Sequence, residues 1–184
     1  MHIFVKNIEM EQFEEICNKF HQGSWDDYRS FVPPGIPDPL TEDEYYRIPV
    51  YKGACMVILM LWGPGAATAL HDHGGSIGRV KVLKGSVTEE RYSFDGSKLE
   101  LLASNIGHPG DILNVSVNDI HSVKNPGKEM SVSLHVYGTD SNTFEGTKIY
   151  DPENKRVGIL NEMATRATWR EKPEAFSSIT YFGK

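Results

Sequence analysis

Hydrophobic residues repeat with a helical period in the first part of the chain. They stand three or four residues apart at Met10, Phe13, Ile16, Cys17 and Phe20. This spacing places them on one face of a helix, and early acidic residues suit its N-terminal end. A second short helix is expected over residues 25–31, before the proline-rich stretch 32–39. Thr41 and Glu44 have the spacing of a capping box, which predicts one more helical turn.

From residue 47 onward the pattern changes to that of strands. Residues 54–62 are almost continuously apolar, as in a buried strand. Shorter runs separated by Gly, Pro and Asn follow at 68–73, 78–83, 86–94, 98–103, 111–115, 120–123, 130–137, 147–150 and 157–160. Asp95-Gly96 lies between two of them and is a strong hairpin signal. Many short strands favour a barrel or jelly roll over a parallel α/β sheet.

Length and composition fit one ordinary globular domain. The chain has 184 residues, of which 39% are hydrophobic and 24% are charged. We expect a single domain over residues 1–184, in which a mostly helical part (1–45) packs on a β-barrel with a C-terminal tail (46–184). The net charge is -6 and the basic residues are scattered, so no nucleic-acid partner is expected.

The sequence shows no membrane or export signal. No stretch is long and apolar enough to span a bilayer. The first residues turn acidic at once, unlike a signal peptide. Two cysteines do not make a disulfide framework. We therefore expect a cytoplasmic monomer without a membrane partner.

Three histidines predict a metal site. His71 and His73 are two residues apart on a predicted strand and would share one face, and His121 follows on a later strand. Neutral imidazole is a ligand for Fe, Zn, Cu or Ni. One His-x-His pair is weak evidence, because histidines are often structural, but the third histidine favours a metal. Asp119 is either a hydrogen-bonding partner of His121 or an ordinary loop carboxylate.

A second polar group stands on one later strand. Ser133, His135 and Tyr137 alternate with Val132, Leu134 and Val136, so the three polar side chains share a face. Hydroxyl, imidazole and phenol groups can form a hydrogen-bonded chain with fixed proton directions. The alternative is a structural set of polar residues in the wall of a barrel, whose hydrogen-bonding groups are all paired. A functional role is favoured, because the segment is otherwise apolar.

These residues together resemble known motifs. The run Gly65-x5-His71-x-His73-x4-Gly78-x6-Gly85 resembles the first cupin motif, and His121-x3-Asn125 resembles the end of the second. Cupins usually have an acidic ligand where this chain has Gly78. The resulting three-histidine set resembles cysteine dioxygenases and related thiol dioxygenases. The resemblance spans residues 45–137 and implies a mainly β, cupin-type jelly-roll β-barrel with N-terminal helices. Agreeing features are Tyr45-x-Arg47, Trp62-Gly63 and Ser133-x-His135-x-Tyr137.

The resemblance implies an enzyme that uses non-haem Fe(II), bound by His71, His73 and His121. It would add both atoms of O2 to the sulfur of L-cysteine and form cysteine sulfinate. Three neutral ligands leave the charge of Fe(II) uncompensated, and a facial set leaves positions open for a thiolate and O2. Tyr137 is implied to orient O2 or the substrate, with His135 and Ser133 behind it. Arg47, assisted by Tyr45, is implied to clamp the substrate carboxylate.

Three alternatives stay open. In 3-mercaptopropionate dioxygenases a Gln takes the place of Arg47 and an Arg near the C-terminal end binds the carboxylate; Arg166 and Arg170 stand there in this chain. A non-catalytic metal- or ligand-binding cupin would have the same fold. A zinc-dependent isomerase or hydrolase would need a general base, and no acidic residue is in motif register.

Animal cysteine dioxygenases have, at the position of Gly78, a Cys cross-linked to the active-site tyrosine. Gly78 therefore implies an unmodified Tyr137, as in many bacterial relatives.

Overall fold

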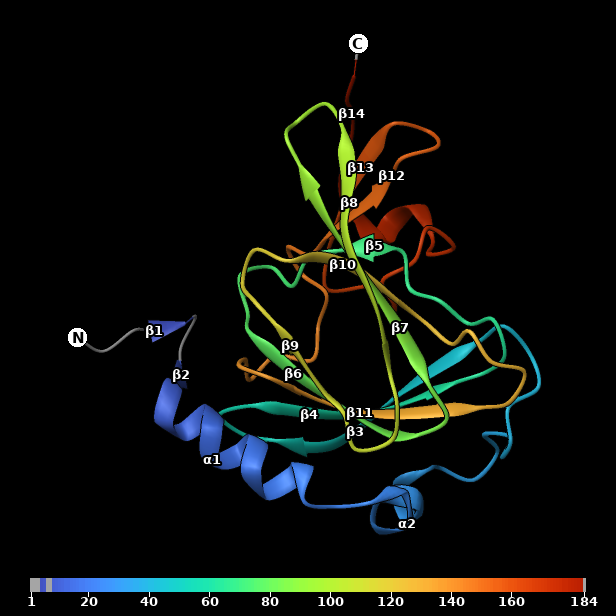
Figure 1. The fold of residues 1–184 in the computed structure, drawn as a ribbon. Coiled ribbons are helices and arrows are strands. Elements are labelled where there is room, and N and C mark those ends of the chain that lie inside the picture. Colours follow the sequence, from blue (N-terminus) through green and yellow to red (C-terminus); the bar gives the residue numbers. More distant parts are fainter. Residues whose placement is uncertain (1–3, 6–7, 184) are drawn as a thin grey trace.

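Two antiparallel sheets dominate the computed structural model, which describes residues 4–5 and 8–183 (Figure 1). The larger sheet contains β5 (Leu70–His71), β7 (Val87–Phe94), β8 (Leu99–Gly107), β10 (Ile120–Lys124), β12 (Lys148–Asp151), β13 (Arg156–Leu160) and β14 (Phe176–Tyr181). The smaller sheet contains β3 (Tyr45–Lys52), β4 (Met56–Trp62), β6 (Gly78–Lys84), β9 (Ile112–Val115) and β11 (Ser131–Tyr137). Their orders are β14-β13-β12-β5-β10-β7-β8 and β3-β4-β11-β6-β9. A separate two-stranded pair joins β1 (Phe4–Val5) and β2 (Ile8–Glu9).

This arrangement confirms the mainly β, cupin-type jelly roll with N-terminal helices. The closed barrel was not confirmed. Among the described residues each sheet keeps two edge strands, which are β14 and β8 in one sheet and β3 and β9 in the other. Closure into a barrel needs a continuous hydrogen-bond ladder around the ring. The ladder stops at these four edges, so the molecule is a sandwich of two sheets.

The two central strands of the smaller sheet, β4 and β11, are buried on both faces, and their residues alternate between two cores. All seven residues of β4 are buried, in agreement with the continuous apolar run. Val57, Leu59 and Leu61 point to the outer core, which they share with Leu134 and with Phe13 of the helical part. The intervening residues point inward, between the sheets, where they meet side chains of the larger sheet. The inward-pointing residues of β4 are Met56, Ile58, Met60 and Trp62.

The helical part covers the outer face of the smaller sheet (Figure 1). It comprises α1 (Met10–His21) and α2 (Trp25–Tyr28), followed by a 3₁₀ turn at Arg29–Phe31, as the sequence pattern predicts. Arg79 of β6 donates hydrogen bonds of 2.6 and 2.7 Å to the carboxylate of Glu14. Lys81 donates to the backbone carbonyls of His21 and Gly23 at the end of α1, where a cation is favourable. Two basic side chains of the sheet therefore fix α1 in place.

The predicted helical turn at residues 41–44 is wrong. The segment bends at residues 42–43 without forming a helical turn and then enters β3, and the backbone N–H of Gly63 donates to the carbonyl oxygen of Glu44 at 2.8 Å. The capping-box spacing of Thr41 and Glu44 is a local signal. The ladder between β3 and β4 overrides this signal, because the ladder satisfies many backbone groups at once.

In the part of the chain that the structure describes, neither helix has the length and apolar character needed to cross a membrane.

The outer core predicts where the fold is sensitive to cavity formation. Leu134 is fully buried in it, so Leu134→Ala should lower the free energy of unfolding by about 2–5 kcal/mol. Leu102 on β8 is 66% exposed, so Leu102→Ala should change the same quantity by less than about 0.5 kcal/mol. Urea unfolding of both variants measures the difference. Equal losses would contradict the described packing.

Candidate metal centre

Three histidines converge between the sheets on the inner face of the larger one. His71 and His121 are cross-strand partners on β5 and β10. His73 lies just after β5, which is shorter than the predicted strand. The ring centroids are 4.9 Å apart for His71 and His121, 5.0 Å for His71 and His73, and 4.8 Å for His73 and His121. One nitrogen atom from each ring lies within 4.8 Å of the others, which is close enough to hold one metal ion.

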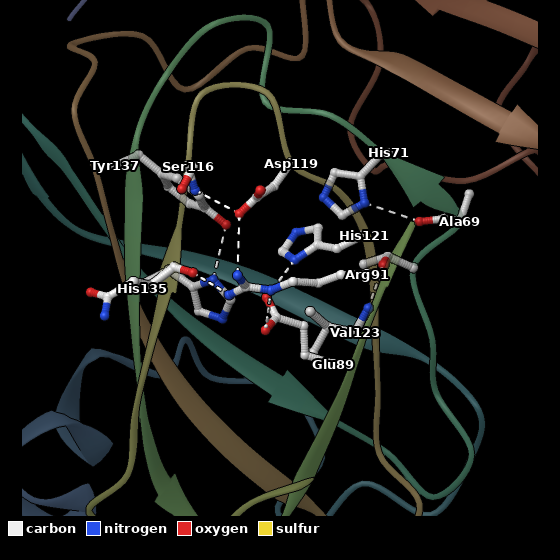
Figure 2. A network of polar contacts seen from close by, with 12 residues as sticks. Ala69, His71, Glu89, Arg91, Ser116, Asp119, His121, Val123, His135 and Tyr137 are labelled. Atoms are coloured by element: carbon white, nitrogen blue, oxygen red, sulfur yellow. Dashed lines mark hydrogen bonds and ion pairs between the residues drawn. The ribbon is translucent and has the colours of Figure 1, made fainter. Parts of the chain in front are cut away.

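The hydrogen bonds of these rings suit a metal site. The Nδ1 atom of His71 is 3.0 Å from the carbonyl oxygen of Ala69, and the Nδ1 atom of His121 is 2.8 Å from Oε1 of Glu89 (Figure 2). Both acceptors favour a proton on Nδ1, which leaves the lone pair of Nε2 for a metal. Nδ1 of His73 is buried and has no partner among the described residues. Buried unpaired nitrogen is costly, and an ion held by this ring would offset that cost. The three residues therefore fit a divalent first-row metal ion.

The surroundings keep these imidazoles neutral. Burial lowers the pKa of His71, and it lowers the pKa of His73 and of His121 well below the ordinary value. Repulsion from neighbouring histidines lowers the pKa of His73 and of His121 further. A metal ligand must be unprotonated, so near neutral pH the three rings need not lose a proton to bind an ion.

Beside the histidine cluster, β11 carries the predicted polar chain. Oγ of Ser133 lies 2.8 Å from Nε2 of His135, and Nδ1 of His135 lies 2.9 Å from the hydroxyl of Tyr137. The ring of Tyr137 is 5.4 Å from that of His73. Trp62 on β4 extends the chain, because its Nε1–H donates to Oγ of Ser133 at 2.8 Å. The predicted shared face is confirmed, and Trp62 is an additional member.

Trp62 fixes the direction of the protons in this chain. An indole N–H can only donate, so Ser133 accepts from Trp62. Among the described hydrogen bonds, the Ser133 hydroxyl hydrogen then finds an acceptor only at Nε2 of His135. Burial lowers the pKa of His135 well below the ordinary value, so the ring is neutral and its Nδ1–H donates to Tyr137. The phenolic proton of Tyr137 is left to point into the cavity, and burial raises the pKa of that phenol to about 12.

Arg47 and Tyr45 line the same cavity, which has a volume of about 470 Å³ and also contains the three histidines and Tyr137. The guanidinium of Arg47 lies over the ring of Phe144, 4.2 Å from its centroid. Burial lowers the pKa of Arg47, and no carboxylate among the described residues pairs with it. Burial raises the pKa of Tyr45 to about 12, so it is a neutral phenol. A buried cation without an anionic partner is costly and suits a site for an anionic ligand.

The two C-terminal arginines lie elsewhere. Arg166 stands 5.6 Å from the centroids of the Tyr45 and Tyr46 rings and lines a neighbouring cavity of about 460 Å³. Arg170 is exposed and forms an ion pair of 3.2 Å with Asp43. Neither residue lines the cavity of the histidines. Of the three candidate arginines, only Arg47 is placed beside the candidate metal centre.

Gly78 begins β6 opposite Tyr137 of β11. A Cβ atom at this position would lie 3.1 Å from Cδ1 and 3.3 Å from Cε1 of the Tyr137 ring, and 3.4 Å from the Cβ of Val115. These separations are tight, so a longer side chain would displace the tyrosine. Gly78 therefore both lacks an acidic side chain and allows the ring of Tyr137 to pack closely against the backbone.

Two residues of the site, Glu89 and Phe144, carry no motif signal. Glu89 contacts His121, and Phe144 supports Arg47. Trp62 belongs to the Trp62-Gly63 feature of the resemblance, but its hydrogen bond to Ser133 was not predicted. Asp119, the other candidate partner of His121, instead accepts from the backbone N–H of Ser116 at 2.8 Å. The alternation of β7 could have placed Glu89 on an inward face, but nothing in the sequence pairs that face with His121.

A jelly roll of two sheets with three converging, neutral histidines defines the class of metal-binding cupins. The family model described as "Cysteine dioxygenase type I" matches residues 39–151, which is more than half of the chain. The chain therefore belongs to the cysteine dioxygenase type I family. The matched range includes every histidine of the cluster, Arg47 and the polar chain of β11.

Solved structures with partial likeness include three bacterial proteins. One is an uncharacterized double-stranded β-helix protein from Klebsiella pneumoniae, with 20% identity over 66% of this chain and 86% of that one and a TM-score of 0.49. Another is described as a sugar phosphate isomerase from a cupin superfamily of Silicibacter pomeroyi, with 16% identity, coverage of 76% and 77%, and a TM-score of 0.49. The third is TT1209 from Thermus thermophilus, with 23% identity, coverage of 60% and 92%, and a TM-score of 0.44.

Family membership and the histidine cluster together suggest a thiol dioxygenase-type cupin. Such an enzyme is an oxidoreductase, and the family implies a small thiol substrate and O2. The family is one of metalloenzymes, in agreement with the fit of the three histidines to a metal ion.

The buried histidines predict how the metal-free protein responds to acid. The pKa of each of His71, His73 and His121 is lower in the folded chain than the ordinary value near 6.5. As the pH falls through about 6.5, the unfolded chain takes up protons that the folded chain does not. The free energy of unfolding should therefore decrease steadily from pH 7.5 to pH 5 in the presence of a chelator. His108→Gln, at an exposed position, should leave this pH dependence unchanged. Urea unfolding across the range measures it, and constant stability would contradict the described burial.

Proposed function

We propose that the protein is a non-haem Fe(II) thiol dioxygenase that adds both atoms of O2 to the sulfur of L-cysteine and releases cysteine sulfinate. The main support is one observation. Among the residues that the structure describes, a cluster of three neutral histidines shares a cavity with an arginine that pairs with no carboxylate, and no carboxylate takes part in the cluster. Family membership agrees with this reaction class.

His71, His73 and His121 would hold the iron. Bound Fe(II) would supply the electron transfer that allows O2 to react with a thiolate. Because all three ligands are neutral, the site retains a double positive charge, which favours an anionic sulfur ligand. Gly78 contributes to this preference, since a carboxylate there would offset the charge and occupy space beside Tyr137.

Arg47 would bind the carboxylate of the substrate. Its guanidinium offers parallel N–H donors that match a carboxylate, and the ring of Phe144 holds the guanidinium plane. Tyr45 lies two residues earlier on β3 and lines the same cavity, where its phenol could donate to the same anion. The substrate would then lie between Arg47 and the histidines, which fixes its orientation.

Tyr137 would act as an unmodified phenol. Gly78 has no thiol that could cross-link to Tyr137, which supports grouping this chain with the family members that lack the cross-link. With His135 donating to its oxygen, Tyr137 directs its own proton into the cavity, where it would donate to O2 or to the substrate. Ser133 and His135 serve by fixing that direction.

We also propose that residues 1–184 form one cupin domain that acts as a monomer in the cytoplasm. The packing of the helical part supports a single domain, because α1 and α2 share the outer core with the smaller sheet. The alternative of 3-mercaptopropionate as substrate would assign the carboxylate to Arg166 or Arg170, and neither of these lines the cavity of the histidines. A non-catalytic cupin is the alternative from another class.

Thiol-dependent oxygen uptake tests the proposed function. Iron-loaded protein is mixed with cysteine, 3-mercaptopropionate or cysteamine in an oxygen electrode, and sulfinate is measured by mass spectrometry. We expect cysteine to give the largest kcat/KM, with one O2 consumed per sulfinate formed. A larger value for 3-mercaptopropionate would reassign the substrate. Absence of uptake and of sulfinate with all three thiols would reject the enzyme.

The position of Arg47 predicts a selective loss of activity. Arg47→Ala should lower kcat/KM for cysteine by about 10- to 100-fold, because a charged hydrogen-bond pair is worth about 1.5–3 kcal/mol. Cysteamine lacks the carboxylate, so its kcat/KM should change much less. Arg166→Ala, in the neighbouring cavity, is the matched control and should leave the cysteine reaction nearly unchanged. The carboxylate clamp would have to be reassigned if Arg166→Ala caused the larger loss.

A further inference from the structure

We propose that Glu89 is a positioning residue for the metal centre, which orients His121 and strengthens Nε2 of that ring as a donor while the three ligands stay neutral. This inference rests on the metal-binding part of the proposed function and is independent of the thiol that is oxidised. Glu89 is 1% exposed and belongs to no motif described above. Its oxygen Oε1 lies 2.8 Å from Nδ1 of His121.

The register of two strands brings Glu89 to this position. In the ladder between β7 and β10, Arg91 stands opposite His121 and Glu89 stands opposite Val123. Glu89 and Arg91 are two residues apart, so both lie on the face of β7 that carries the side chain toward His121. Glu89 is thus the diagonal neighbour of His121, within reach of a long side chain.

Both oxygens of this buried carboxylate have a partner. Oε1 meets the ring of His121, and Oε2 accepts from Nε of Arg91 at 3.0 Å. Arg91 in turn forms an ion pair of 3.5 Å with Asp119 and donates to the backbone carbonyl of Asn114 (Figure 2). An ordered series therefore runs from Asp119 through Arg91 and Glu89 to His121.

The series has a chemical consequence for His121. A carboxylate that accepts from Nδ1–H fixes the tautomer and the ring orientation, and it makes Nε2 a stronger electron-pair donor. Arg91 alone would cancel the charge of Glu89. Because Arg91 is shared with Asp119, two carboxylates face one guanidinium, and one negative charge remains. Gly78 leaves the metal without a carboxylate ligand. The carboxylate of Glu89 lies behind the imidazole of His121, so Glu89 occupies no coordination position and the ligands themselves stay neutral.

The neighbouring residue offers a matched comparison. Glu90 follows Glu89 on β7, points to the opposite face and accepts from Lys124 at 2.7 Å. Its ion pair is of similar length and also reaches a side chain of β10, the strand of His121, but none of its hydrogen bonds among the described residues involves a histidine. Glu89→Gln and Glu90→Gln each remove one negative charge with almost no change in volume, so they separate the contact with His121 from general charge effects.

The test measures metal affinity by competition with a chelator, using Zn²⁺ and, anaerobically, Fe²⁺. Glu89→Gln should weaken the affinity by about 10- to 100-fold, as is typical when the partner of a metal-bound histidine is removed. Glu90→Gln should bind like the unmodified chain. At saturating Zn²⁺, the gain in unfolding free energy should shrink in Glu89→Gln by about 1.4–2.8 kcal/mol. A merely structural role would lower the stability of the metal-free and Zn²⁺-bound forms equally and would overturn the proposal.

A second measurement needs no variant. In ¹⁵N-labelled, Zn²⁺-bound protein, NMR should show a proton on Nδ1 of His121, and zinc bound at Nε2. Zinc bound at Nδ1, or an Nδ1 without a proton, would contradict the inference even if Glu89→Gln does not fold. If the unmodified chain binds neither metal, the proposed function and this inference both fail. If the unmodified chain binds metal and Glu89→Gln binds equally well, only the inference about Glu89 fails.

Discussion

The pairing of β5 with β10 is the constraint on which the site depends. It sets His71 directly opposite His121 inside the sandwich, and His73 completes the cluster from the next turn. Burial keeps all three imidazoles neutral, and neutral imidazoles can converge on one point without strong repulsion. A shift of this pairing by one residue would turn His121 to the other face of the sheet and remove the site.

The two faces of the smaller sheet have different roles, because one packs against the helices and the other carries polar side chains of the site. One face of β4 and β11 is apolar and is covered by α1, so it stabilises the fold. The other face carries Trp62, Ser133, His135 and Tyr137, whose hydrogen bonds set a single proton direction. Arg47 lines the cavity without an anionic partner among the described residues, so it suits a substrate. Glu89 does not line the cavity; both of its oxygens are paired, and in our proposal it acts through His121.

Local patterns predicted much of this arrangement. Helical spacing located α1 and α2, the apolar run located β4, and alternation placed Ser133, His135 and Tyr137 on one face. The motifs also identified the histidines that cluster. Local patterns failed at residues 41–44, where the ladder of β3 overrides a capping signal. They also left Asp119 and Arg166 as candidates. Asp119 is separated from His121 by Arg91 and Glu89, and Arg166 lies in a separate cavity.

The sequence by itself determined which side chains share a strand face, because that depends only on the two-residue period of a strand. It therefore determined the polar chain of β11, whereas His73 lies just after the end of β5 and reaches the cluster through the fold. Only the tertiary structure decided which distant residues support them. Glu89 is 32 positions from His121, and Trp62 is 71 positions from Ser133. Such contacts follow from the register between strands, which no local pattern specifies.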